Sequence, residues 1–186
     1  KLQRQMRLNK NLVNAQFLKG EEVRGFLFSI LKNKAAEKIL RLMHETDLLG
    51  QILPEFGLSH CKVNHDFYHH YTADEHSLRV IRFLEELVVT AITNPTDLSA
   101  LYQDYLRKGI LKLSALLQSL RKMPASGNEF LSPLAERLSL EDADAQILLF
   151  LLTNPYTMIE TALHQDIHQP TVIRKFAETV ASPEKL

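Results

Sequence analysis

Histidine and acidic side chains gather in one short stretch of the chain, from His65 to His76. Four of the eight histidines lie within these twelve positions, and Asp66, Asp74 and Glu75 stand among them. Imidazole and carboxylate groups hold transition metals, which lower the pKa of a bound water and polarise a phosphoryl oxygen. The stretch is therefore the strongest candidate for metal binding or phosphate chemistry.

The residues that follow predict a helix that positions this stretch. Thr72 or Asp74 can cap its first turn, and apolar residues then recur at three- and four-residue steps from Leu78 to Val88. His76 therefore lies in the first helical turn, one step from the apolar stripe, and can point toward a metal or a substrate phosphate. The alternative, which is commoner for a lone histidine, is a partly buried side chain bonded to backbone or carboxylate.

Three segments of the sequence resemble one known family. They are residues 42–56, with Met43-His44-Glu45-Thr46 and Leu53-Pro54-Glu55-Phe56, residues 65–78, with His65-Asp66-x-x-His69-x-Tyr71-Thr72-x-Asp74-Glu75-His76, and residues 158–177. Their order and content resemble the HD-type, uridylyl-removing domain of the bacterial PII uridylyltransferase/uridylyl-removing enzymes. The resemblance implies an all-helical domain whose family uses a divalent metal and water to remove UMP from a tyrosine of the PII signalling protein.

The resemblance also implies a set of metal ligands, and most of their positions hold other residues here. His76 fills the first ligand position. The naming His-Asp pair of the family falls on Gln118 and Ser119, shortly before Lys122. A later histidine aligns with Asn128, and a His-His pair falls on Asn154 and the proline after it. The last aspartate of the family would lie past Leu186.

Amide and hydroxyl groups are poor ligands and lack the charge of the missing carboxylate. We therefore expect His76 to be a vestigial metal position, no catalytic residue, no cofactor, and loss of hydrolysis. The substituted positions would form a neutral polar pocket for a small polar ligand, and such a domain would serve as a regulatory or scaffold module. The pocket residues are Gln118, Ser119, Lys122, Asn128 and Asn154.

Other interpretations stay open. A residual metal-dependent phosphohydrolase could recruit unconventional ligands around His76, and only then would a divalent metal be the cofactor. His164 and His168 are four residues apart, but the intervening sequence favours a turn and surface histidines. Cys61 and His60 could form a Cys-His nucleophile, but they are neighbours only in sequence, and this alternative has little support. A module that docks partners through exposed apolar helix faces is a third possibility, although the bundle core accounts for most apolar stripes.

Composition limits the class of protein. Lysine plus arginine and aspartate plus glutamate both total 22, so the formal charge is zero, which argues against a nucleic-acid or anionic-membrane surface. The longest apolar run, Ile147 to Leu152, is far shorter than the roughly 20 residues of a membrane span. A single cysteine excludes an internal disulfide, and we expect a cytoplasmic protein.

The whole pattern predicts an all-α fold, a single HD-domain-like helical bundle. We expect residues 1–186 to form one domain, with framework helices in 1–55 and a degenerate HD core in 56–186. Helices are expected over 6–17, 21–31, 35–50, 74–93, 97–105, 106–120, 139–153, 158–163 and 170–180, with loops over 56–71 and 123–133. The chain begins at Lys1, and we expect a fragment of a larger multidomain protein that resembles a bifunctional nucleotidyltransferase/hydrolase. Its partners would be the other domains of that protein and a PII-type signalling protein.

Overall fold

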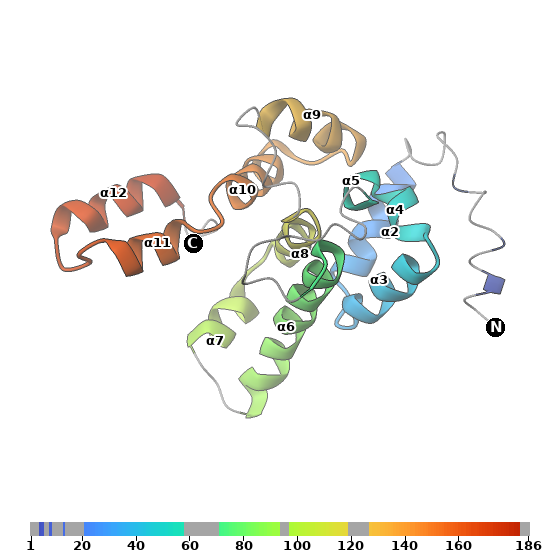
Figure 1. Cartoon of the computed structure of the whole chain (residues 1–186), viewed down its shortest axis with the longest axis horizontal. Coiled ribbons are helices and arrows are strands. Elements are labelled where there is room, and N and C mark those ends of the chain that lie inside the picture. The colour runs from blue at the N-terminus through green and yellow to red at the C-terminus, as the bar shows by residue number, and fades with distance from the viewer. Residues whose placement is uncertain are drawn as a thin grey trace.

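The fold is seen in a computed structural model that describes residues 4, 5, 8, 13, 21–57, 71–93, 97–118 and 127–182. Within these residues the regular structure consists of eleven helices and no strand, so the predicted all-α class is confirmed (Figure 1). The helices are α2 (Glu21–Leu31), α3 (Ala36–Glu45), α4 (Leu48–Ile52), α5 (Pro54–Gly57), α6 (Ala73–Thr93), α7 (Asp97–Asp104), α8 (Lys108–Leu116), α9 (Gly127–Arg137), α10 (Asp142–Thr153), α11 (Thr157–His164) and α12 (Pro170–Val180). None of the described helices is both long and apolar enough to cross a bilayer.

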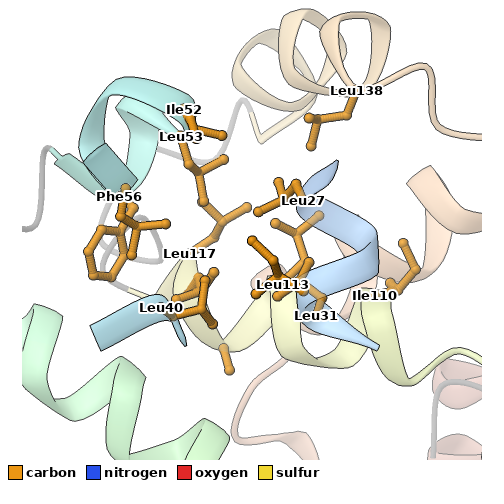
Figure 2. Packing of buried hydrophobic residues seen from close by; sticks show 14 of the residues in the cluster. Leu27, Leu31, Leu40, Ile52, Leu53, Phe56, Ile110, Leu113, Leu117 and Leu138 are labelled. Atoms are coloured by element: carbon orange, nitrogen blue, oxygen red, sulfur yellow. The ribbon is translucent and has the colours of Figure 1, made fainter. Parts of the chain in front are cut away.

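Helix α8 is the central helix of the bundle and lies within the apolar segment 106–120 that was expected to be helical. It packs against α2, α6 and α10, and Leu113 and Leu116 are fully buried. At Gly109, a Cβ atom would lie 3.0 Å from the Phe28 ring, so glycine permits the close approach of α8 to α2. Figure 2 shows the cluster that results, with leucines of α2, α3 and α8 around the same core as Phe56.

The second framework helix ends earlier than the sequence predicted. Helix α3 stops at Glu45, before the end of the helix expected over 35–50, and Asp47 takes the left-handed conformation, with φ of 60°. Gly50 instead lies inside α4, where a Cβ atom would be 3.5 Å from the Cα of Gly57. Helices α4 and α5 therefore pack closely at this glycine, although an added Cβ atom would make only an ordinary van der Waals contact there. Pro54 begins α5, which continues to Gly57, so the loop expected from residue 56 does not begin there.

The stretch 123–133 was predicted to be a loop, and this is wrong for its second half. Helix α9 begins at Gly127 and carries Pro133 at an exposed position in its interior. Leu131, Leu134 and Leu138 are nearly fully buried, so one face of the segment belongs to the core. Tertiary packing of this leucine stripe outweighs the loop-like composition. Residues 119–126 lie outside the described part of the chain.

The last three helices lie where the sequence predicted them, but α10 is partly buried in the core whereas α11 and α12 are mostly exposed. In α10, Ile147, Leu148 and Leu152 are buried, and Leu149 and Leu151 pack against the core less completely. Helices α11 and α12 pack on each other as a hairpin that projects to one side of the body (Figure 1). Most of the helix expected over 6–17 and most of the loop expected over 56–71 fall outside the described residues.

Candidate functional site

The first turn of α6 carries the only predicted metal ligand, and its backbone is fixed locally. Asp74 Oδ1 accepts from the amide of Glu75 at 3.0 Å, and the amide of His76 donates to Thr72 O at 2.9 Å. The two acidic residues also suit the positive end of the helix dipole. His76 therefore lies where the sequence placed it, and its side chain is half-buried.

A histidine from another helix contacts one of the carboxylates beside His76. His44 Nε2 of α3 lies 3.0 Å from Asp74 Oδ2, and the Asp74 side chain is only 6% exposed. The His44 ring also meets the ring of Phe56 edge to face, with centroids 5.3 Å apart. Histidine and aspartate in this contact join α3 to α6 in a largely buried place.

The neighbouring carboxylate is bound by two arginines. Arg41 of α3 donates to Glu75 through Nη1 at 2.7 Å and Nη2 at 3.3 Å, a forked arrangement that matches a carboxylate. Arg79 Nε donates to the same carboxylate at 2.9 Å, and its guanidinium lies 3.8 Å from the centre of the Tyr71 ring. The hydrogen bond from Arg41 lowers the pKa of Glu75, and the bond to Glu75 raises the pKa of Arg41.

We call Arg41 and His44 of α3, together with Asp74 and Glu75 of α6, the α3–α6 clamp. A third acid, Glu37, accepts from Arg41 Nε at 2.6 Å and extends the clamp along α3. His44 and Arg41 were not singled out as functional candidates from the sequence. His44 lies in one of the family-like segments, but no spacing rule links residue 44 to residue 74, so only the fold reveals the pairs.

The same end of α6 also meets the end of α8. Ser77 is buried and its hydroxyl lies 3.5 Å from Leu116 O. Gln118 follows two residues later and is half-buried. The structure therefore brings the predicted first ligand position, at His76, into the same region as the first residue of the substituted His-Asp pair.

For the other predicted pocket residues, the described part of the chain shows no contact with the region of His76 and Gln118. Ser119 and Lys122 lie outside the described residues, as does the side chain of Asn128, whose backbone is in the first turn of α9. Asn154 ends α10, and its amide donates to Phe150 O at 3.2 Å and to Thr153 Oγ1 at 2.9 Å. The predicted neutral pocket therefore stays a prediction, with Asn154 bonded to its own helix.

The fit of a divalent metal follows from the donor set. Within the described ranges, no group of three or more His, Cys, Asp or Glu side chains is arranged to hold a metal ion. Asp74 is in contact with His44, and Glu75 is bound by Arg41 and Arg79. The described residues around His76 do not fit a catalytic metal.

A buried ion pair lies further along α6 and α8. Lys112 Nζ, on a side chain that is 3% exposed, donates to Glu85 Oε1 at 2.9 Å and to Asn33 O at 3.0 Å. The amide of Glu37, at the start of α3, also donates to Glu85 at 3.2 Å. Burial, and to a smaller extent the charge of Glu85, raises the pKa of the Tyr102 phenol to about 12. The lysine within the apolar run of α8 was the available sequence signal for this pair.

These features define a class of protein, an all-helical domain in which a histidine-bearing and acid-bearing helix start packs on a central buried helix. Comparison with known proteins supplies the family. Bifunctional uridylyltransferase/uridylyl-removing enzymes of a Bradyrhizobium species, Zymomonas mobilis and Chromobacterium violaceum are 31%, 30% and 29% identical to the chain over 95%, 96% and 95% of its length. The chain therefore belongs to this family as a homologue of one segment of its members, as the sequence resemblance predicted.

The match covers a small part of each relative. The chain spans about a fifth of these enzymes, 20%, 19% and 22% of their lengths. No family model matches the chain. No solved structure matches it either.

Proposed function

We propose that this chain is a degenerate HD-type domain of a PII-uridylyltransferase-like nitrogen-regulation protein, which lacks uridylyl-removing hydrolysis and acts as a regulatory or scaffold module. The observation that carries the proposal is the α3–α6 clamp. The two carboxylates that precede the vestigial ligand His76 in the first turn of α6 are in contact with α3, so the turn that would present metal ligands instead fastens two helices together.

The chemistry of the neighbouring position supports the same proposal. Where the family resemblance implies a His-Asp pair, the chain has Gln118 and Ser119. An amide and a hydroxyl bring no charge to balance a divalent cation, and a hydroxyl holds transition metals weakly. One imidazole at His76 cannot hold a metal with useful affinity without such partners.

A hydrolysis assay tests the proposal directly. The purified chain is incubated with UMP-modified PII protein and manganese, and release of UMP is measured. We expect no release above a blank without protein. Release of UMP that disappears in His76→Ala would contradict the proposal and support the alternative, a residual metal-dependent phosphohydrolase.

A restored variant keeps a negative result informative. Gln118→His combined with Ser119→Asp returns the residue types of the family pair, and Gln118→Asn with Ser119→Thr is the matched control. If the substituted pair is what removed metal binding, the first variant binds manganese more tightly than the control. Equal manganese binding by both variants would show that the loss does not lie at this pair.

A further inference from the structure

Helix α3 begins without a capping side chain of its own. Its N-cap residue is Ala35, whose φ of −120° and ψ of 34° lie outside the extended conformation of a usual N-cap, and it forms no side-chain cap bond. The first amides of a helix have no acceptor within the helix, and a buried amide without an acceptor is costly. In this first turn Glu37 is only 6% exposed, so its amide needs an acceptor from elsewhere.

A carboxylate from another helix supplies that acceptor. Glu85 Oε1 of α6 accepts from the amide of Glu37 at 3.2 Å. A negative charge at this position also faces the positive end of the α3 dipole, which stabilises the helix start. Glu85 therefore does for α3 what a serine or an aspartate at the N-cap does for many other helices.

The capping carboxylate is itself held by the central helix. Lys112 Nζ of α8 donates to the same oxygen, Glu85 Oε1, at 2.9 Å, and to the carbonyl oxygen of Asn33 at 3.0 Å. The Asn33 side chain in turn accepts from the amide of Ala35 at 2.9 Å. One lysine thus fixes both the cap and the chain that enters α3. The side chains of Lys112 and Glu85 are 3% and 14% exposed, so water competes little for these bonds.

Glu37 connects this cap to the α3–α6 clamp. Its amide donates to Glu85, and its carboxylate accepts from Arg41 Nε, one turn later, at 2.6 Å. Arg41 then binds Glu75 in the first turn of α6. Glu75 and Glu85 are ten residues apart on α6, which is about 15 Å along a helix axis. Helix α3 is therefore tied to α6 at two separated points, and it cannot slide along α6 without breaking one of them.

We propose that Glu85, oriented by Lys112, is the N-terminal cap of α3 and that this cap positions the α3–α6 clamp. The buried ion pair and the clamp are then one coupled unit, in which α8 helps to fix the first turn of α6 through α3. That turn carries His76, so Lys112 and Glu85 are positioning residues for the candidate site although they lie further along α8 and α6. The proposal does not depend on whether the domain hydrolyses UMP.

Amide hydrogen exchange of the wild-type chain, followed for each residue by NMR, tests the cap. Ala143 is the matched control, because it holds the same position in α10, is exposed, and follows an N-cap residue that forms no side-chain cap bond. After correction for intrinsic rates, the amide of Glu37 should exchange at least about tenfold more slowly than that of Ala143. Equal rates would overturn the proposal.

Two double variants separate the capping oxygen from burial, which also slows exchange. Lys112→Met with Glu85→Gln keeps an oxygen that can accept from the amide of Glu37, whereas Lys112→Met with Glu85→Leu removes it, and neither leaves an unpaired charge. The amide of Glu37 should exchange at least about fivefold faster in the second variant than in the first, because its hydrogen bond is lost. The amide of Ala143 should exchange equally in both. Equal exchange of the Glu37 amide would show that Glu85 is not the cap.

Adding Arg41→Met to each double variant measures the coupling to the clamp. The factor by which Arg41→Met raises the equilibrium constant of unfolding should be at least about twice as large where the capping oxygen remains. Arg137→Met is the control, because Arg137 of α9 bonds to Glu55 at 2.6 Å, outside these contacts, and its factor should be the same in both backgrounds. An equal factor for Arg41→Met in both backgrounds would overturn the coupling. Circular dichroism confirms that each variant is folded, and the wild-type comparison with Ala143 still tests the cap if one is not.

Discussion

The bundle centre and the α11–α12 hairpin use similar amphipathic helices with opposite results. Leu40, Leu78 and Leu113 in α3, α6 and α8 are fully buried, whereas Ile159 and Leu163 of α11 are more than half exposed. The centre covers its apolar faces with its own helices and fixes them with ion pairs. The hairpin has an apolar face that the described body does not cover. Helical periodicity therefore specifies which face is apolar, but not what covers it.

The largest expected difference between the two regions is in core leucines. Leu113→Ala removes a side chain that is 0% exposed at the centre of α8, and the free energy of unfolding should fall by about 3 kcal/mol. Leu163→Ala, at a site 70% exposed, should change it by less than about 0.5 kcal/mol. Urea denaturation followed by circular dichroism measures both, at protein concentrations where the chain is monomeric. Equal losses would mean that the hairpin is part of the same core.

Loss of the buried ion pair should have an effect of similar size. Lys112→Met leaves the largely buried carboxylate of Glu85 without its cation, and we expect a loss of about 3 kcal/mol in the free energy of unfolding. Arg82→Met is the surface counterpart, because Arg82 and Glu86 are 52% and 61% exposed, and the expected loss is below about 0.5 kcal/mol.

A double variant distinguishes charge from packing at this pair. In Lys112→Met with Glu85→Gln, no uncompensated charge remains, so most of the lost stability should return. If the double variant is as unstable as Lys112→Met alone, packing of the lysine stem and not the charge is responsible.

The pH dependence of the α3–α6 clamp should be a smaller effect. Arg41 lowers the pKa of Glu75 in the folded state, so the unfolded state binds a proton first as the pH falls. The contribution of Glu75 is complete above its unfolded pKa, about 4.3, and is lost as the pH falls through the lower folded value. Glu75→Gln should flatten the acid limb of a stability–pH curve relative to wild type. An unchanged acid limb would place the acid sensitivity at other carboxylates.

The sequence was sufficient for elements with strong apolar periodicity. It predicted α2, the start of α6, the buried α8, and the last two helices, because each has a continuous stripe and a recognisable end. It was wrong at α9, where the composition of 123–133 favours a loop but buried Leu131 and Leu134 hold a helix. Local composition cannot report a face that becomes stable only by tertiary packing.

The candidate site could be predicted only in part. His76 and the substituted positions follow from residue types in order along the chain. The pairing of His44 with Asp74 joins residues 30 positions apart, and that of Arg41 with Glu75 joins residues 34 positions apart. Both pairs form through the packing of α3 on α6. Such contacts depend on the angle and register of two helices, which no spacing within either helix encodes.

Metal content is the measurement that tests the central claim most directly. The chain is incubated with manganese, iron or zinc, excess metal is removed, and bound metal is measured by mass spectrometry for wild type and His76→Ala. If the first turn of α6 serves as a clamp to α3, neither protein retains a stoichiometric metal. One equivalent retained by wild type and released by His76→Ala would contradict the account, because it would make His76 a working ligand.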